Sequence, residues 1–548
     1  MSKIKIFSLG GLNESGKNMY VIDVDNDIFI FDAGLKFADD KMLGIDYIIP
    51  EFSYLKENIK RIKGIFITHA HEKCMGAVCD IVRELPEIKV FATKFTYDLL
   101  KKDFENQNIE YKNLKLILPH KKITFGKNSV FPVSLTHSVP DTVGYVLNTV
   151  DGAIVYTGNF VFDSSMTGPY KTDIGKLAYI GKQGVLCLMS ESEYADKPGY
   201  TAPNNRISST VRDILLHNEG RILITVFTNH ISRLQELFTE VSNTHRKIVI
   251  MGKKLQNLVN YVIDEGYVTF DKEQIGSLNN IEDRDAIILI SNENEKPFMN
   301  LDRIVNGYDK YIKINENDTV FFMDPTSVGM EKKAVRISDE LSKLGANVIT
   351  LSPKEHLLNH ASQEDLMLML NLMEPKYYFP VMGEYRHQVE NASIAEFLGI
   401  DKKNILLKQN GDVVTFENGN LVEEIERVKI DELLIDGNVA KDIGELVLKD
   451  RELLSDNGIV IICATLNKKT KEILAGPEVL TRGFIYVKEN TDIIEKIKEI
   501  SLSVINSNIS NNYVEFNKIK TGIRDELGKY LYNETECKPM IITVINEI

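Results

Sequence analysis

The most informative segment of this sequence is Ile67-Thr68-His69-Ala70-His71-Glu72-Lys73-Cys74. A short apolar run, 64–68, predicts a strand that leads directly into a loop with the pattern His-x-His. The end of a strand suits metal ligands because little conformational freedom remains to be lost on binding, and imidazole nitrogens suit divalent transition metals. A lone His-x-His pair is a weak signal, so purely structural histidines stay an equal alternative.

Strand-like and helix-like patterns alternate on both sides of this segment. The stretches 20–31 and 145–157 predict β-hairpins, the first with a turn at Asp-Asn-Asp and the second with a turn at Asp151-Gly152. The stretch 78–85 predicts a helix. Strands interleaved with helices predict a layered α/β fold.

The pattern becomes more regular between 204 and 352, where short strands such as 247–251 alternate with helices. This alternation predicts a separate parallel α/β domain. Further along the chain, 444–450 and 459–466 are predicted strands, and 492–505 is a predicted amphipathic helix.

The composition is that of a globular protein with more than one domain. The chain has 548 residues, of which 43% are hydrophobic and 26% are charged. The net charge of −14 argues against non-specific coating of nucleic acid, although a local groove can still be positive. We expect neither a membrane helix nor a signal peptide, and the five scattered cysteines indicate a reducing cytoplasm rather than a disulfide framework.

Further polar motifs follow the His-x-His loop in a fixed order: 136–141, 156–160, 189–192, 356–364 and 380–386. In this order the set resembles the motif series of the ribonuclease J family, metallo-β-lactamase nucleases with a β-CASP insertion. The resemblance runs nearly end to end, from 31–37 through 184–188 to 481–484 and 519–525.

The resemblance implies an α/β protein with an αββα metallo-β-lactamase domain, an inserted parallel α/β β-CASP domain and a small αβ C-terminal domain. The expected metallo-β-lactamase parts are 1–203 and 353–428, and the β-CASP domain is 204–352. A linker, 429–443, and an oligomerisation domain, 444–548, are expected to follow.

The family has two metal ions, which activate a water and stabilise in-line phosphoryl displacement. His69, His71 and His137 match the three histidines of the first metal. At the bridging and second-metal positions this chain differs from the family's ligands throughout, with Lys73, Cys74, Asn159 and Met382.

Each of these four residues is a poor ligand for a second divalent cation. The Lys73 ammonium repels a dication, Asn159 lacks the charge of a bridging carboxylate, and the Met382 thioether is too soft. Cys74 can bind zinc as a thiolate, but a single ligand does not hold a metal. We therefore expect zinc or manganese at the three histidines alone, or no bound metal and histidines that remain as hydrogen-bonded remnants.

The resemblance also implies catalytic and RNA-contacting residues. Glu191 and His360 are the expected catalytic pair, with bracing of a loop as the alternative for Glu191, and Asp32 is expected to order the loop around the site. The expected substrate contacts are Lys73, Asn229, His230, His356, Leu357, Leu358, Asn359, His360 and Ser362. The family's Ser-Gly is replaced by Leu358-Asn359, so this contact is altered.

Three functions fit these observations. The first is a 5′-to-3′ exoribonuclease, with endonuclease activity as well, that has weak intrinsic activity and acts on 5′-monophosphorylated RNA in mRNA decay and rRNA maturation. The second is a non-catalytic RNA-binding subunit that pairs with an active paralogue, other RNA-decay enzymes being further expected partners. The third is another metallo-β-lactamase hydrolase such as a lactonase, which the insertion 204–352 and His360-Ala361-Ser362-Gln363 disfavour.

Overall fold

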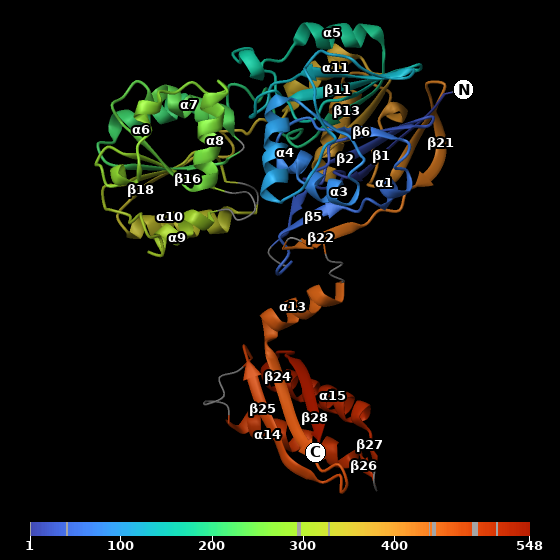
Figure 1. The fold of residues 1–548 in the computed structure, drawn as a ribbon, viewed down its shortest axis with the longest axis vertical. Coiled ribbons are helices and arrows are strands. Elements are labelled where there is room, and N and C mark those ends of the chain that lie inside the picture. Colours follow the sequence, from blue (N-terminus) through green and yellow to red (C-terminus); the bar gives the residue numbers. More distant parts are fainter. Residues whose placement is uncertain are drawn as a thin grey trace. The chain divides into compact units, whose positions relative to one another are not determined.

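The computed structural model describes residues 2–39, 42–228, 230–292, 298–326, 329–437, 439–440, 445–484, 491–510 and 513–548. The chain divides into two compact units, 1–37 with 47–433 and 38–46 with 434–548. Both are mixtures of helices and strands (Figure 1). Among the described residues, every helix is too short or too polar to cross a membrane.

Two β-sheets form the centre of the first unit. One has the order β21-β20-β1-β2-β3-β6-β7-β8 and is built from β1 (Lys3–Gly10), β2 (Met19–Val24), β3 (Asp27–Phe31), β6 (Ile62–Phe66), β7 (Val90–Ala92), β8 (Leu114–Leu116), β20 (Asp412–Glu417) and β21 (Asn420–Arg427). The other has the order β19-β13-β12-β11-β10-β9 and is built from β9 (Ile123–Phe125), β10 (Asn128–Ser134), β11 (Val143–Thr149), β12 (Gly152–Tyr156), β13 (Val185–Glu191) and β19 (Tyr377–Val381).

An aromatic core joins the two sheets face to face. Phe31 of the first sheet packs on Tyr145 and Tyr156 of the second, with ring centroids 5.6 Å and 5.8 Å apart. Helices cover the outer faces (Figure 1): α5 (Ile174–Gln183), α11 (Gln363–Met373) and α12 (Tyr385–Phe397) lie on the second sheet, and α1 (Ser53–Glu57) lies on the first. The layers are therefore αββα, as predicted.

Both predicted hairpins are present, and the second differs by one residue in its turn. Strands β2 and β3 pair across Asp25 and Asn26. Thr149 pairs with Gly152, so the turn residues are Val150 and Asp151, and Gly152 is the first residue of the returning strand, at φ +122°. The predicted helix 78–85 is α3 (Val78–Glu84).

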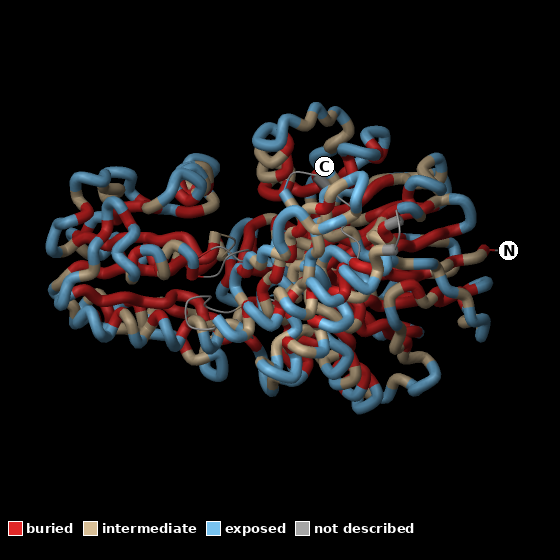
Figure 2. Tube along the Cα trace, turned by 90° about the horizontal axis from the view of Figure 1, so that it is seen from below, coloured by how far each residue is buried: buried red, intermediate tan, exposed pale blue. Residues whose placement is uncertain are grey.

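The first unit also has an open, fully parallel sheet of order β15-β16-β14-β17-β18, formed by β14 (Ile222–Val226), β15 (Ile248–Met251), β16 (Ile287–Ser291), β17 (Thr319–Phe322) and β18 (Asn347–Thr350). One face is covered by α6 (Ser208–His217), α7 (Ile231–Val241) and α8 (Lys253–Asp264), and the other by α9 (Met299–Val305) and α10 (Glu331–Lys343) (Figure 1). The central strands are buried on both faces, which accounts for their continuous apolar runs (Figure 2).

Shorter elements complete the first unit: β4 (Lys36–Phe37), β5 (Tyr47–Pro50), α2 (Glu72–Met75) and α4 (Lys94–Asn106). The segment expected to be a linker, 429–443, includes β22 (Glu432–Asp436) and β23 (Val439–Ala440), which pair antiparallel at Ile435 and Ala440. These two strands give the segment more regular structure than a free linker has.

The second unit has a three-stranded sheet of order β25-β24-β28, with β24 (Ile459–Leu466), β25 (Ile473–Arg482) and β28 (Met540–Glu547). Helices α14 (Thr491–Ser507) and α15 (Phe516–Thr535) pack against one face, and β26 (Ile509–Ser510) and β27 (Tyr513–Val514) pair between these helices. The predictions of strand 459–466 and helix 492–505 are confirmed.

The prediction of a strand at 444–450 is wrong for 445–450, which belong to α13 (Glu445–Asn457). The apolar run Leu446-Val447-Leu448 suggested a strand, but the segment as a whole is rich in Glu, Leu, Lys and Arg, which are strong helix formers. The longer window decides the structure here.

Candidate active site

The three predicted histidine ligands lie together at one end of the two facing sheets. His69 and His71 follow β6, and His137 lies in the loop between β10 and β11, so both sheets contribute to the cluster. Their ring centroids are 4.6–4.8 Å apart, and their candidate ligand atoms all lie within 4.8 Å of one another. Segments that are far apart in sequence thus form one compact cluster of nitrogens.

The nitrogens of this histidine cluster fit a single metal ion. His69 Nε2 is buried and has no hydrogen-bond partner. His71 Nδ1 and His137 Nε2 are 3.3 Å apart, close to the ~3.3 Å spacing of two nitrogens on a tetrahedral zinc ion with bonds of ~2.0–2.1 Å. Three histidines with an open fourth position are a known arrangement for a catalytic zinc.

Burial keeps the cluster in the form that binds metal. It lowers the pKa of His69 to about 3, with a smaller contribution from His360. Burial, and then the neighbouring histidines, lower the pKa of His137 well below its usual range. Both rings are therefore neutral at pH 7, and neutral imidazole is the form that coordinates a metal.

A carboxyl group behind the cluster orients His69. Asp32, at φ +60°, accepts hydrogen bonds from the Thr68 amide at 2.8 Å and from the Tyr156 hydroxyl at 2.7 Å. The Thr68 hydroxyl donates to Asp32 at 3.0 Å and lies 2.9 Å from His69 Nδ1. The hydroxyl has a single proton, which it donates to Asp32, so it can only accept a hydrogen bond from the N–H at His69 Nδ1. Nε2 of His69 is then left without a proton and is the ligand atom. Burial raises the pKa of Asp32 to about 7, although its hydrogen bonds oppose the rise.

The predicted catalytic pair also lies next to the cluster. Glu191, at the end of β13, is fully buried, and its Oε2 accepts hydrogen bonds from His360 Nδ1 at 2.8 Å and Asn159 Nδ2 at 2.7 Å. Its Oε1 accepts the amides of Phe160 at 2.7 Å and Ala361 at 3.3 Å. The ring of His360 is 5.8 Å from that of His137. With both oxygens engaged, Glu191 braces the loops that carry Asn159 and His360.

Three of the four residues at the second-metal positions contact one another. Asn159 Nδ2 lies 3.3 Å from Met382 Sδ, and Cys74 Sγ lies 4.0 Å from Asn159 Oδ1. Cys74 also accepts a hydrogen bond from Asn18 at 3.6 Å. Burial, and to a lesser extent Asp32, raise the pKa of the Cys74 thiol well above its usual range. A neutral amide and a thioether are weak ligands for zinc or manganese, and the Cys74 thiol alone does not hold a metal, so this set does not fit a second divalent cation.

The fourth residue, Lys73, is already paired. Its Nζ lies 2.6 Å from Ser15 Oγ and 3.3 Å from Glu193 Oε1, and Ser15 donates to the same carboxylate oxygen at 2.6 Å. Burial alone would raise the pKa of Glu193, but Lys73, then His360 and Ser15, lower it to about 2. Gly34 lets the helix that carries Lys73 approach, since a Cβ there would lie 1.6 Å from the Lys73 carbonyl oxygen.

The first expected substrate-binding loop reaches the edge of the histidine cluster. His230 Nδ1 lies 2.6 Å from the buried carboxylate of Asp324, which also accepts from Arg233 at 2.9 Å. The His230 ring is 6.3 Å from that of His71. The expected contact Asn229 lies outside the described residues.

The second expected loop, 356–362, is bonded mainly to the protein itself. Asn359 Oδ1 accepts from Asn205 at 2.9 Å, and the Leu357 carbonyl accepts from Arg233 at 2.9 Å. Ser362 caps α11. The Leu358 carbonyl accepts from the His360 amide at 2.9 Å. His356 Nδ1 is buried without a hydrogen-bond partner.

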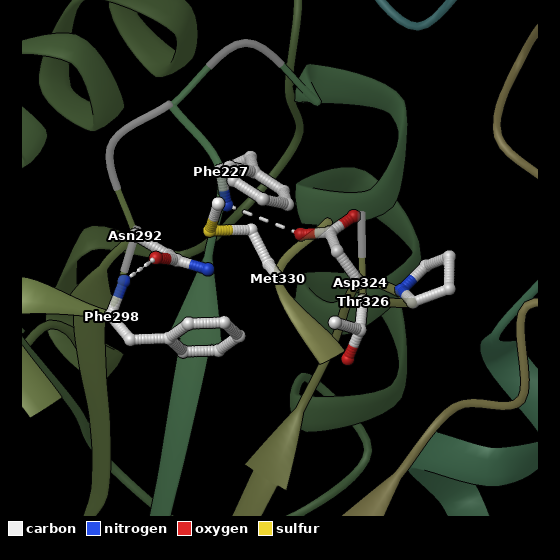
Figure 3. A pocket seen from close by; sticks show the side chains of 7 residues that line it. Phe227, Asn292, Phe298, Asp324, Thr326 and Met330 are labelled. Carbon is white, nitrogen blue, oxygen red and sulfur yellow. Dashed lines mark hydrogen bonds between the residues drawn. The ribbon is translucent and has the colours of Figure 1, made fainter. Parts of the chain in front are cut away.

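A small cavity lies at the carboxyl ends of β14, β16 and β17, where Asp324, the partner of His230, forms part of its lining (Figure 3). Such strand ends often bind ligands. Here Asn292 Oδ1 accepts the Phe298 amide at 2.7 Å and Asp324 accepts the Phe227 amide at 3.2 Å, and most of the remaining lining is apolar. These polar groups are engaged within the protein, so we assign the cavity no ligand.

The sequence did not point to four residues that shape the site: Ser15, Thr68, Glu193 and Asp324. Thr68 and Glu193 stand beside recognised motifs, and a charged residue directly after the motif 189–192 was a usable signal for Glu193. Nothing in the sequence marks Ser15 or Asp324, because each acts through a partner far away in the chain.

Comparisons with known proteins agree with this architecture. Family models match for "Ribonuclease J, beta-CASP domain" at 219–341 and "Ribonuclease J C-terminal domain" at 446–548. The chain is 38% identical to "Ribonuclease J2" of Bacillus subtilis (strain 168), covering 100% of this chain and 99% of that protein. It is 36% identical to "Ribonuclease J 2" of Staphylococcus aureus (strain MRSA252), covering 100% of this chain and 98% of that protein.

One solved structure, titled "Crystal Structure of a Protein of Unknown Function from Enterococcus faecalis V583", has a TM-score of 0.54 at 14% identity, over 76% of this chain and all of that chain. That likeness concerns the fold alone. The relatives in Bacillus and Staphylococcus, by contrast, match this sequence from end to end. The chain belongs to the ribonuclease J family of metal-dependent hydrolytic nucleases.

Proposed function

We propose that this protein is a nuclease that degrades RNA from a 5′-monophosphorylated end, with low intrinsic activity and one metal ion at most. Its proposed setting is mRNA decay and rRNA maturation in the cytoplasm, where its five free cysteines stay reduced. The observation that carries the proposal is the histidine cluster, in which buried His69 Nε2 has no hydrogen-bond partner. A buried polar atom without a partner needs an explanation, and a metal ion supplies one here because the candidate ligand atoms of the three histidines lie within 4.8 Å of one another.

His69, His71 and His137 would hold the metal, zinc or manganese. When bound, such an ion supplies a Lewis acid that activates water and stabilises charge on the phosphate. Thr68 and Asp32 fix the proton of His69 on Nδ1. The Ser138 hydroxyl, 3.1 Å from His71 Nε2, orients the second ring.

The protein's own residues would position the RNA. Because His360 Nδ1 is held by Glu191, its Nε2 is the atom that can contact a phosphate oxygen. His230 is held in the same way by Asp324, and its ring lies 6.3 Å from that of His71, which makes it a second candidate contact. Lys73 is the least suited of the expected contacts, because Glu193 already neutralises its charge.

The decisive experiment measures decay of a 5′-monophosphorylated RNA by the purified protein while manganese or zinc is titrated. We expect slow, metal-dependent cleavage that His71→Ala abolishes. The same RNA with a 5′ hydroxyl is the substrate control and should be degraded more slowly. If the wild type shows no cleavage at any metal concentration, the catalytic proposal is wrong.

The second unit supports a second candidate function, that of a subunit paired with another chain. The sheet face opposite α14 and α15 has an apolar centre, where Ile461 stands in register with Leu480 and Ile542. Leu480 is 52% exposed, Ile542 40% and Val544 38%. Exposed, contiguous apolar side chains of this kind often mark an interface.

We propose that this face binds a second copy of the chain or an active paralogue. Ile542→Asp places a charge at its centre and should lower the molar mass measured by light scattering. Lys538→Asp, outside the face, is the control. An unchanged mass for Ile542→Asp, or a monomeric wild type that does not bind an active ribonuclease J, would contradict the pairing.

A further inference from the structure

We propose that the residues at the second-metal positions form a closed, metal-independent network in which the ammonium of Lys73 takes the place of the second divalent cation. The inference deepens the proposed function, since it rests on the assignment of those positions from the family. It goes beyond the loss of ligands, because it predicts that the charge of Lys73 and the hydrogen bonds of Asn159 stabilise this part of the site without a metal.

The first part of this network is a cation held by the protein itself. Lys73 Nζ contacts Ser15 Oγ at 2.6 Å and Glu193 Oε1 at 3.3 Å, and Ser15 closes the triangle with a 2.6 Å bond to Glu193. The side chain of Glu193 is 14% exposed and that of Lys73 is 39% exposed. A nearly buried carboxylate needs a counter-charge, and Lys73 supplies it.

The second part is organised by the amide of Asn159. Its Nδ2 donates to Glu191 Oε2 at 2.7 Å and lies 3.3 Å from Met382 Sδ. Its Oδ1 faces the thiol of Cys74 at 4.0 Å. An amide has both a donor and an acceptor, whereas the carboxylate of the family's aspartate would have acceptors only. Asn159 can therefore hold Glu191 and Cys74 at once without any metal.

The charge and the ligand types of these two groups disfavour the binding of a second divalent cation. A metal there would meet the ammonium of Lys73, the neutral amide of Asn159 and the thioether of Met382, which are poor ligands for zinc or manganese, and the single thiol of Cys74 would not hold it. An aspartate at 159 without a metal would face the Glu191 carboxylate at hydrogen-bond distance, and two such carboxylates cannot both be ionised. Asn159 and Lys73 are thus substitutions that stabilise an empty second position.

Two pairs of variants, each a single substitution and its compensating double substitution, test this network in the full-length protein. The protein is first dialysed against a chelator, and the thermal midpoint (Tm) of unfolding is measured. Lys73→Met should lower the Tm by about 2–4 °C, because it leaves Glu193 without a counter-charge. Adding Glu193→Gln in the double variant should restore most of the loss.

The second pair exchanges amide and carboxylate. Asn159→Asp should lower the Tm without metal. Combining Asn159→Asp with Glu191→Gln should regain it. The amide oxygen of the introduced glutamine keeps the hydrogen bonds from the Phe160 and Ala361 amides, while its amide nitrogen donates to the introduced aspartate and to His360 Nδ1, whose proton then moves to Nε2. Neither pair uses RNA, so the test is separate from that of nuclease activity.

The expected result is rescue by the second substitution in both pairs, including the case in which a single variant fails to fold and its double variant folds. Two results would overturn the inference. One is a Tm for Lys73→Met and Asn159→Asp equal to that of the wild type. The other is double variants that are no more stable than the single ones.

Discussion

The histidine cluster and the second-metal positions lie side by side, yet their polar atoms are in opposite states. In the cluster, the candidate ligand atom His69 Nε2 is buried without a hydrogen-bond partner. At the second-metal positions, Lys73 is paired with Glu193, and Asn159 with Glu191. A buried polar atom without a partner needs an explanation, and within the histidine cluster a metal ion supplies one. Paired atoms indicate a site that has been rebuilt to work without one.

The largest effect is expected when the family's ligands are restored at all four second-metal positions. The substitutions are Lys73→Asp, Cys74→His, Asn159→Asp and Met382→His. The variant should gain a second metal and cleave RNA faster by about 10²-fold, because a second cation contributes several kcal/mol of charge stabilisation in the transition state. Metal content and RNA decay are both measured. The single variant Lys73→Asp, which removes the counter-charge of Glu193 without completing a site, is the control and should gain neither. If the fourfold variant gains neither metal nor activity, the missing ligands do not limit this protein.

A smaller effect distinguishes the histidine cluster from the second-metal positions: the change in Tm when metal is added. Zinc at 100 times its Kd should stabilise the wild type by about 2.7 kcal/mol, seen as a rise in Tm. His137→Ala should lose this rise, whereas Met382→Leu should keep it, because Met382 is not a ligand. If both variants lost the metal-induced rise in Tm equally, Met382 would also be a ligand, and the metal would be bound by the histidine cluster and the second-metal positions together.

The pH dependence of stability sharpens the account of Asp32, the group behind the histidine cluster. Its folded pKa is raised to about 7, above the ~3.9 of an unfolded aspartate. The folded protein thus holds the extra proton between these values, and this contribution to stability falls as pH rises from about 4 to 7. Between pH 4 and 7 the slope should differ between wild type and Asp32→Asn by about 1.4 kcal/mol per pH unit, which is one proton. Parallel unfolding curves would show that Asp32 is ionised throughout.

The smallest expected effects come from two serines: Ser15, which contacts Lys73 at the second-metal positions, and Ser138, which contacts His71 in the histidine cluster. Ser15→Ala removes a hydrogen bond from Lys73 and Glu193 and should cost about 1 kcal/mol of stability, with metal affinity unchanged. Ser138→Ala removes the hydroxyl beside His71 and should weaken metal binding by about tenfold, with little change in Tm. Chemical denaturation and metal titration of both variants give the answer. A loss of metal affinity in Ser15→Ala, or a loss of stability without a change in metal affinity in Ser138→Ala, would contradict this assignment.

Local signals predicted a layered α/β fold and the pair His69 and His71, whereas the αββα order and the third ligand, His137, came from the resemblance to the family. Hairpins have turn residues and alternating strands, and His69 and His71 stand directly after a strand. The strand predicted at 444–450 failed because a short apolar run does not distinguish a strand from the start of α13. The partners of Lys73 were not predictable: Ser15 and Glu193 lie 58 and 120 residues away, and only the packing of the sheets brings them together.

The measurement that tests the central claim most directly is elemental analysis of the purified full-length protein after exposure to excess manganese or zinc and removal of unbound metal. The account predicts one metal ion per chain at most, bound at the histidine cluster and absent from His71→Ala. Two ions per chain in the wild type, or an unchanged metal content in His71→Ala, would contradict it.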